Sequence, residues 1–265
     1  MTGLSLPFNG IYDEAAMAAF LPALQQAKAL GAESIEIRNV SPECDPKAVA
    51  KAVDFFTALG FRISVHGAMR SPETAVKDVF APLSEVLPGL KQNSLNITVH
   101  PFVGDNTAAL TRLSDHITEN CLPVTIALEN NRLLPDGSQG DCAEYVLDTV
   151  KHVDRPNVGI CFDLGHYLYF VLKNHPENPD MLPSKEFYRR VIHTHIHALR
   201  GHSTHFPLTK EYNMPLAKYL APLAPAFSGI FNLELSFNKF ADALPPADAL
   251  AASLKSLRAA LAALS

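Results

Sequence analysis

Residues 124–163 read VTIALENNRLLPDGSQGDCAEYVLDTVKHVDRPNVGICFD. The stretch starts and ends with an apolar, β-rich run, 124–129 and 158–163, and these runs close on Glu129 and Asp163. Residues 141–152 lie between them and have the pattern of a helix. A strand, a helix and a second strand in this order form a βαβ unit, whose two strands are parallel.

The same unit recurs along the whole chain at intervals of roughly 30 residues. Strands are predicted at Leu4–Phe8, Ser34–Arg38, Arg62–His66, Asn96–His100, Val124–Glu129, Val158–Asp163, Ile192–His197 and Gly229–Ser236. Helices are predicted at Glu14–Leu30, Pro46–Leu59, Pro72–Leu87, Ala108–Glu119, Asp141–His152, Gly165–Lys173, Pro215–Leu223 and Ala247–Leu264. Eight such units close naturally into a barrel, so we predict one (β/α)8 TIM-barrel domain over residues 1–265. An open doubly wound sheet is the second choice, because no GxGxxG follows the first strand.

Composition excludes several classes of protein and partner. The 265 residues include 22 Lys and Arg against 27 Asp and Glu, a formal net charge of −5, which provides no broad basic surface for nucleic acid. No apolar run approaches the roughly 20 residues of a membrane helix. The four cysteines form no CxxC, which favours a reducing cytoplasm. We therefore expect a cytoplasmic protein with neither a nucleic-acid nor a membrane partner.

Ionisable side chains end six consecutive predicted strands. They are His66, His100, Glu129, Asp163, His197 and Glu234. In a barrel the carboxyl ends of the strands carry the functional groups. A single histidine at a strand end is more often a structural residue than a ligand, but three carboxylates converging on one mouth are harder to explain without a function.

Those three carboxylates indicate a bound cation. Two bare charges about 4 Å apart repel by roughly 4 kcal/mol at an effective dielectric constant near 20. Glu129, Asp163 and Glu234 would therefore be costly together unless they were protonated or bridged by a metal. With the imidazole of His197 they form a mixed oxygen and nitrogen site, which suits one divalent cation such as Mn²⁺, Co²⁺, Mg²⁺ or Zn²⁺.

Strand alternation predicts which residues lie below this mouth. Side chains two residues apart share a face. The partners of the six terminal residues are small or polar: Ser64, Thr98, Ala127, Cys161, His195 and Asn232. His193 is expected near the barrel floor in a structural role, and the sequence leaves the role of His195 open.

Several short segments, in order along the chain, resemble the xylose-isomerase-like TIM-barrel superfamily, which includes sugar isomerases and epimerases and the endonuclease-IV-type apurinic endonucleases. The segments are 31–38 (GAESIEIR), 64–67 (SVHG), 128–131 (LENN), 161–166 (CFDLGH), 196–199 (IHAL) and 233–235 (LEL). The resemblance implies that the metal ligands are Glu129, Asp163, His197 and Glu234. It also implies that His166 contacts substrate.

The chemistry that fits these residues is the isomerisation or epimerisation of a sugar, sugar phosphate or other ketose. A metal stabilises the enediolate, and carboxylates on opposite sides of the carbon remove and return its proton. Glu129 and Glu234 fit this acid/base pair, although the sequence does not exclude a hydride shift or a dehydration. The expected substrate-binding residues are His66, His100, His166, Glu36 and Arg200.

Two other functions remain open. A zinc-dependent apurinic endonuclease is favoured by His66 and His100, which match that branch, and His205 matches a further ligand. The aspartate expected two residues before His205 is Ser203, however, and a serine hydroxyl is a poor zinc ligand. We therefore expect one metal ion rather than three. A non-catalytic ligand-binding barrel is the third alternative, and a homo-oligomer is compatible with each.

Overall fold

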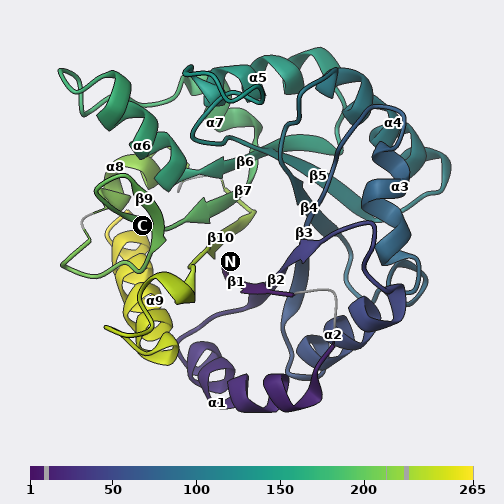
Figure 1. Cartoon of the computed structure of the whole chain (residues 1–265), viewed down its shortest axis with the longest axis horizontal. Helices are drawn as coiled ribbons and strands as arrows, with labels where there is room; N and C mark the ends of the chain where they lie inside the picture. The colour runs from purple at the N-terminus through teal and green to yellow at the C-terminus, as the bar shows by residue number, and fades with distance from the viewer. Residues whose placement is uncertain (9–11, 213, 224–226, 265) are drawn as a thin grey trace.

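The computed structural model describes residues 1–8, 12–212, 214–223 and 227–264. Eight parallel strands close into a barrel in the order β1-β10-β7-β6-β5-β4-β3-β2. The last strand of the barrel pairs with the first, with Gly3 opposite Asn232. Figure 1 looks down on this barrel, with the strands in the middle and the helices around them. The (β/α)8 TIM barrel predicted from the sequence is confirmed.

The barrel strands lie close to the predicted positions. Their bounds are β1 Thr2–Pro7, β2 Ser34–Val40, β3 Arg62–Gly67, β4 Leu95–Val99, β5 Val124–Glu129, β6 Val158–Asp163, β7 Val191–Ile196 and β10 Ile230–Leu233. β10 ends at Leu233 rather than at Ser236, and β7 ends at Ile196 rather than at His197. Glu234 and His197 therefore lie just beyond their strands, at the barrel mouth.

Nine α-helices are present in the described part of the chain. Their bounds are α1 Glu14–Ala29, α2 Pro46–Ala58, α3 Ala75–Phe80, α4 Asn106–Glu119, α5 Cys142–Val153, α6 Leu164–Asn174, α7 Lys185–Arg190, α8 Leu216–Leu220 and α9 Pro246–Ala262. An aspartate caps several of them: Asp13, Asp45, Asp105, Asp141 and Asp163 accept backbone N–H groups in the first turns of α1, α2, α4, α5 and α6. Such caps satisfy amides that the helix itself leaves unpaired.

Proline explains the main difference between the predicted and observed helices. The predicted helix Pro72–Leu87 is only the short α3, followed by the 3₁₀ turns Ala81–Leu83 and Leu87–Gly89. These turns contain Pro82 and Pro88, which donate no backbone hydrogen bond and clash with the preceding turn of an α-helix. α8 is likewise shorter than the predicted helix that includes it.

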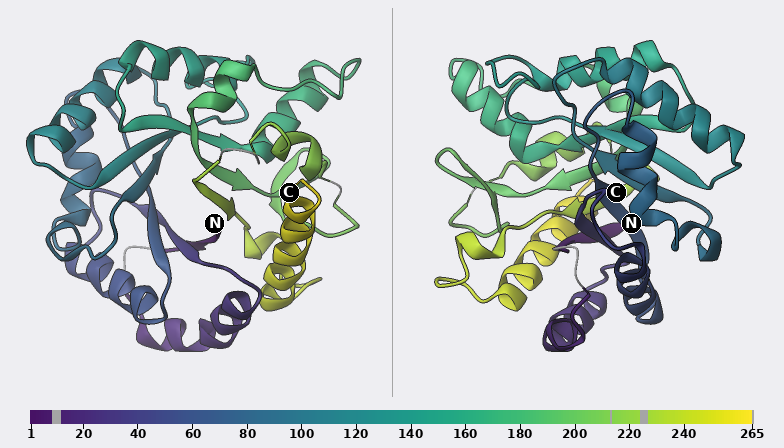
Figure 2. Two further views of the ribbon diagram at one scale, coloured as in Figure 1. Left: turned by 180° about the vertical axis from the view of Figure 1, so that it is seen from behind. Right: turned by 45° about the vertical axis from the view of Figure 1, so that its right-hand side comes forward.

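Two features were not predicted from the sequence. α7 forms between α6 and β7. Directly after β7, the strands β8 (Ala198–Arg200) and β9 (Ser203–Phe206) form an antiparallel hairpin on the mouth side of the barrel. Figure 2 shows the helical layer around the barrel from behind and from an oblique angle. No helix in the described ranges is both long and apolar enough to cross a membrane.

The two faces of the strands differ as the alternation predicts. Phe162 in β6 points outward and packs against Tyr167 of α6 and Phe187 of α7, with ring centroids 5.8 and 5.1 Å away. Inside the barrel, Glu36 accepts hydrogen bonds from other buried polar side chains: Ser5 Oγ at 2.7 Å, Thr98 Oγ1 at 3.3 Å and Asn232 Nδ2 at 3.2 Å. The apolar core thus lies between strands and helices, and the barrel interior below the mouth is polar.

Candidate metal centre

Four buried side chains from neighbouring strands converge at the mouth of the barrel. Glu129 ends β5, Asp163 ends β6, His195 lies in β7 and Glu234 follows β10. One ligand atom from each lies within 4.8 Å of those from the other three. Each residue is at most 5% exposed. The structure thus brings together the three predicted carboxylates, and it adds His195 to them.

His195 is the imidazole at the centre of this group. Its Nδ1 lies 3.0 Å from Glu129 Oε2 and 3.3 Å from Glu234 Oε2. Its Nε2 lies 2.9 Å from Glu36 Oε1, on the barrel-floor side. A histidine that binds a metal through one nitrogen commonly has a carboxylate beside the other. The surroundings of His195 therefore suit a ligand whose Nδ1 points into the mouth.

Several polar atoms in this group have no hydrogen-bond partner among the described residues. They are Nδ1 and Nε2 of His195, Oε1 of Glu129 and Oε2 of Glu234, and Nε2 of His100, beside the group, is another. Some lie close to a neighbouring carboxylate or imidazole, but none is directed as a hydrogen bond. A buried polar atom without a partner is costly, and such atoms are rare in native proteins. Three carboxylates and an imidazole whose ligand atoms lie within 4.8 Å of one another fit a divalent cation.

The electrostatics of the group keep its carboxylates charged. Burial raises the pKa of Glu129, but the imidazoles of His195 and His100 outweigh burial and hold that pKa well below its usual range. Burial likewise raises the pKa of Glu234, and His195 and His205 outweigh it. A carboxylate must be charged to bind a cation or to accept a proton.

Arg38 of β2, the last residue of that strand to pair with β1, is a second unpredicted contact of the site. Its Nη1 donates to Glu234 Oε1 at 2.9 Å, and its Nη2 donates to the carbonyl of Leu235 at 3.2 Å. Oε2 of Glu234 remains directed toward His195 and His205, each 3.3 Å away. Arg38 therefore holds the outer oxygen of Glu234 and leaves the inner oxygen facing the group.

His66 and His100 connect the site to a cleft. Their Nε2 atoms lie 3.0 and 3.2 Å from Glu129 Oε2, and their rings are in edge contact. Both line a cavity of about 880 Å³ that also includes Ser41 and Glu43 of the loop after β2. Cavities of this size commonly bind small molecules. The two histidines thus lie where a ligand in the cleft would approach Glu129.

Two other expected substrate-binding residues lie away from the mouth. Glu36 is fully buried, and its Oε2 lies 3.0 Å from Nε2 of His193. It is therefore beneath His195 rather than in the cleft, where it supports the histidines of β7. Arg200 is exposed at the turn of the β8–β9 hairpin. Within the described part of the chain, Glu36 contacts one residue of the mouth, His195, from below. No contact of Arg200 with the residues of the mouth is seen there.

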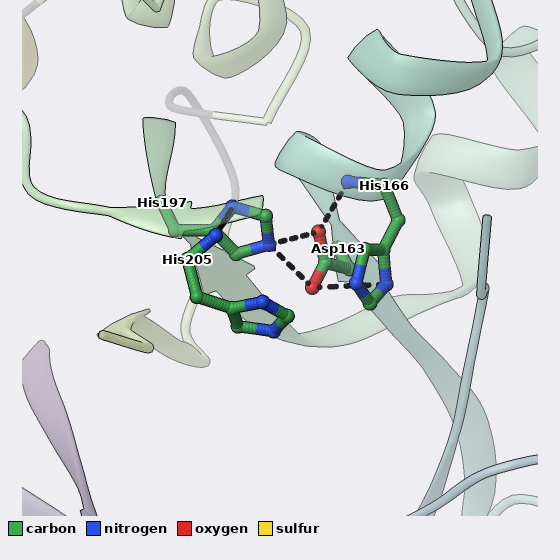
Figure 3. Close-up of side chains that lie close together, drawn as sticks. All are labelled: Asp163, His166, His197 and His205. Atoms are coloured by element: carbon green, nitrogen blue, oxygen red, sulfur yellow. Dashed lines mark hydrogen bonds and ion pairs between the residues drawn. The ribbon is translucent and has the colours of Figure 1, made fainter. Parts of the chain in front are cut away.

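A second group of possible ligands adjoins the first and shares Asp163 with it. Figure 3 shows Asp163, His166, His197 and His205, whose ligand atoms also lie within 4.8 Å of one another. His197 Nε2 lies 3.1 Å from both Oδ1 and Oδ2 of Asp163. His66, His100 and Glu129 form a third such group. His197, which the sequence suggested as a ligand beside Glu129 and Glu234, thus lies in the second group.

The protonation of His166 is fixed by its neighbours. Its Nδ1 lies 3.2 Å from the carbonyl oxygen of Asn130, which accepts only, so Nδ1 carries the hydrogen. Burial lowers the pKa of His166 to about 4, although Asp163 opposes this. The imidazole is therefore neutral near pH 7, and its Nε2 has a free lone pair.

Asn130 fixes the backbone of Asp163. Its Oδ1 accepts from the amide of Asp163 at 2.9 Å, and its Nδ2 donates to the carbonyl of Asp163 at 3.0 Å. The side chain is only 1% exposed. These two bonds join the end of β6 to the residue that follows Glu129, and so they set the relative position of two candidate ligands.

Replacing Asn130 by alanine is expected to lower the free energy of unfolding by about 2–4 kcal/mol, because two buried backbone groups would lose their partners. Denaturant-induced unfolding measures this change. Asn131→Ala is the matched control, because the side chain of Asn131 accepts a hydrogen bond from the amide of Arg132 at the surface. Equal stability of the two variants would contradict the role given to Asn130.

The chain was compared with known proteins. The family model described as xylose isomerase-like TIM barrel matches residues 24–260. A search of curated proteins finds no match. Among solved structures, the chain resembles a D-tagatose 3-epimerase-like protein, with a TM-score of 0.70 and 18% identity over 100% of this chain and 98% of that one.

Two further solved structures show the same fold. D-allulose 3-epimerase from Methylomonas sp. in complex with D-allulose gives a TM-score of 0.63 and 17% identity over 97% of this chain and 96% of that one. The probable 3-DHS dehydratase of Bacillus anthracis gives a TM-score of 0.55 and 15% identity over 97% of this chain and 99% of that one. These likenesses concern the fold, while the family model covers most of the sequence. The chain belongs to the xylose isomerase-like TIM barrel family.

Proposed function

We propose that this protein is a divalent-metal-dependent epimerase or isomerase of a small sugar or related ketose. The observation that carries the proposal is the convergence of Glu129, Asp163, His195 and Glu234, whose ligand atoms lie within 4.8 Å of one another. In this proposal the imidazole ligand is His195, whereas the sequence indicated His197, which lies in the adjoining group with Asp163, His166 and His205. The unpartnered atoms of this group and its oxygen-rich composition suit Mn²⁺, Co²⁺, Mg²⁺ or Zn²⁺.

The residues of the mouth can perform the proton transfers of such a reaction. A bound cation would polarise the carbonyl and hydroxyl oxygens of the substrate. Glu129 from β5 and Glu234 after β10 reach the mouth from well-separated strands of the barrel, and both are held in the charged form. One removes the proton from the carbon next to the carbonyl, leaving its electron pair in an enediolate, and the other returns a proton to the opposite side.

Histidines beside the two glutamates are placed to orient the substrate. His66 and His100 line the cleft and can donate hydrogen bonds to sugar hydroxyls. The neutral ring of His166 has a free lone pair, so it can accept a hydrogen bond from a sugar hydroxyl. Sugar binding is supported by the D-allulose complex of the Methylomonas protein, which shares this fold.

The proposal is tested by turnover. Metal-loaded protein is incubated with free and phosphorylated ketoses in deuterium oxide, and the products are analysed by NMR. Conversion with deuterium incorporated at the epimerised or isomerised carbon is expected, because the abstracted proton exchanges with solvent. Conversion without deuterium would favour a hydride shift, and loss of water would favour a dehydratase. No conversion of any ketose by metal-loaded protein would contradict the proposal.

An abasic-site nuclease is the second candidate, and a specific observation favours it. Two further groups of possible ligands, His66 with His100 and Glu129, and Asp163 with three histidines, flank the central one. A nuclease of the endonuclease-IV type would hold three zinc ions, whereas we expect one ion per chain. Elemental analysis and an abasic-duplex nicking assay separate the two: three zinc ions per chain with metal-dependent nicking would replace the sugar proposal.

A further inference from the structure

We infer that the substrate is an anionic ketose, whose phosphate or carboxylate group binds Lys239 and Arg132 at the rim of the barrel mouth. The inference rests on the proposed function and names the class of its substrate. Lys239 lies in the loop after β10, and Arg132 lies in the loop after β5. β10 and β5 are on either side of β7 in the barrel, so the two cations, which we call the basic rim, flank the β8–β9 hairpin that follows β7.

The hairpin holds Lys239 beside the candidate metal centre. Nζ of Lys239 donates to the carbonyl oxygen of Thr204 in β9 at 2.8 Å. The residue after Thr204 is His205, whose Nε2 lies 3.3 Å from Oε2 of Glu234. The carbonyl of His205 also accepts from the amide of Ser236, which begins the loop that carries Lys239. An ammonium group has three donors, so Lys239 has two left for a ligand.

Arg132 lies on the other side of the hairpin, next to α6. Its guanidinium carbon is 5.7 Å from the ring centroid of Tyr169 in α6. The same ring is 5.9 Å from that of His202, at the turn of the hairpin, which packs beside α6 (Figure 1). Stacking on an aromatic face leaves the N–H groups of a guanidinium available, and they bind a phosphate or a carboxylate through two hydrogen bonds at once.

The basic rim has no counter-charge of its own. Among the described residues, neither Arg132 nor Lys239 forms an ion pair with a carboxylate. Burial lowers the pKa of Lys239, and the charges of Arg132 and Arg38 lower it further, so these cations lie close enough to repel one another. Glu234 opposes this effect, but one of its oxygens is bound by Arg38. A bound anion would turn this repulsion into attraction.

The opposite side of the mouth offers an anion no free cation. The described residues that line the cleft beside His66 and His100 include neither lysine nor arginine. The nearby Arg70 is bound by both oxygens of Glu43, at 2.6 and 3.0 Å, and Glu43 itself lines the cleft. Carboxylate and imidazole groups suit the neutral hydroxyls of a sugar. The substrate would thus bind with its anionic end at the basic rim and its hydroxyl groups in the cleft.

Binding of three unreactive analogues tests the inference without turnover. Xylitol is neutral, xylitol 5-phosphate carries a phosphate and xylonate carries a carboxylate, while none has the ketone or aldehyde that the reaction needs. Their affinities for Zn²⁺-loaded protein are measured by isothermal titration calorimetry. We expect one of the two anions to bind at least about 10-fold more tightly than xylitol, as a hydrogen bond to a charged group provides. The preferred anion shows whether the group is a phosphate or a carboxylate.

Two substitutions locate the bound anion. Lys239→Gln and Arg132→Gln should each weaken binding of the preferred anion by about 10-fold or more, so that most of its advantage over xylitol is lost. Lys218→Gln and Arg155→Gln are the matched controls, because each of these cations already pairs with an aspartate. Lys218, like Lys239, also donates to a backbone carbonyl. Both controls should bind the three analogues as wild type does.

The outcomes separate this inference from the proposed function. If xylitol binds as tightly as both anions, if none of the three binds, or if the advantage of the anion survives in either variant of the basic rim, the inference is wrong. Conversion of a neutral ketose would then leave the proposed function standing. If an anion binds at the basic rim but metal-loaded protein converts no ketose, neutral or anionic, the proposed function is wrong. A preference that is lost in both rim variants and kept in both controls supports the inference.

Discussion

Replacement of Glu129 or Glu234 by glutamine is expected to lower turnover by roughly 10²–10⁴-fold while leaving the fold intact, because general acid–base catalysis contributes about that much. Glutamine has nearly the same shape as glutamate but cannot take up the proton. The measurement is kcat on whichever ketose the protein converts, together with the metal content of each variant.

Metal content separates the two roles of these residues. A variant that keeps its ion but loses turnover has lost an acid or base, whereas one that loses both has lost a ligand. Glu186→Gln is the control, because Glu186 pairs with Arg189 and Arg190 on the surface of α7. If either variant at the mouth keeps near-normal turnover, the role given to that glutamate is wrong.

Replacement of His195 by alanine is expected to weaken divalent-metal affinity by more than about 100-fold, beyond the 10–100-fold typical of outer partners. The variant loses the only imidazole in the group with Glu129, Asp163 and Glu234. It also removes the positive neighbour that lowers the pKa of Glu129 and Glu234, so both carboxylates become easier to protonate. Competition with a chelating dye measures the affinity.

The control for His195 is a histidine on the surface. His152, in the last turn of α5, is exposed, and His152→Ala should leave metal affinity unchanged. If His195→Ala still binds the ion within a few-fold of wild type, His195 is not a ligand.

The fold could be predicted from the sequence because the alternation of strands and helices leaves few choices. β5 and β6 have the predicted bounds, and each of the eight predicted strands is in the barrel. The β8–β9 hairpin could not be predicted in this way. It is short, and only three or four residues form each of its strands. Its position over the mouth depends on contacts with residues distant in sequence, such as the bond between His205 and Ser236.

The candidate site could be predicted only in part. The stagger of the barrel strands explains why the sequence could not show which histidine of β7 lies beside the three carboxylates. Strands in a closed barrel are offset, so their last residues do not share a level. Asp163 is opposite His195 in the pairing of β6 with β7, and His197 lies two residues further along. The alternation of side chains placed both histidines on the inner face, but only the register shows which one faces the three carboxylates.

Glu36 illustrates the same limit. Its strand and inward face were clear from the sequence, but its depth was not. Glu36 lies below the mouth, where it contacts the buried residues Asn232, His193 and His195. A carboxylate at that depth is explained by the histidines it supports. The sequence did carry a sign of this contact, because residues 193–197 have three histidines at alternate positions.

A crystal structure of the protein loaded with Mn²⁺ or Zn²⁺, with anomalous diffraction to locate the ion, tests the central claim most directly. We predict one anomalous peak per chain, at roughly 2.0–2.3 Å from carboxylate oxygens of Glu129, Asp163 and Glu234 and from Nδ1 of His195. An ion bound by Nε2 of His197, three ions in the mouth, or no peak between the carboxylates at saturating metal would contradict the account.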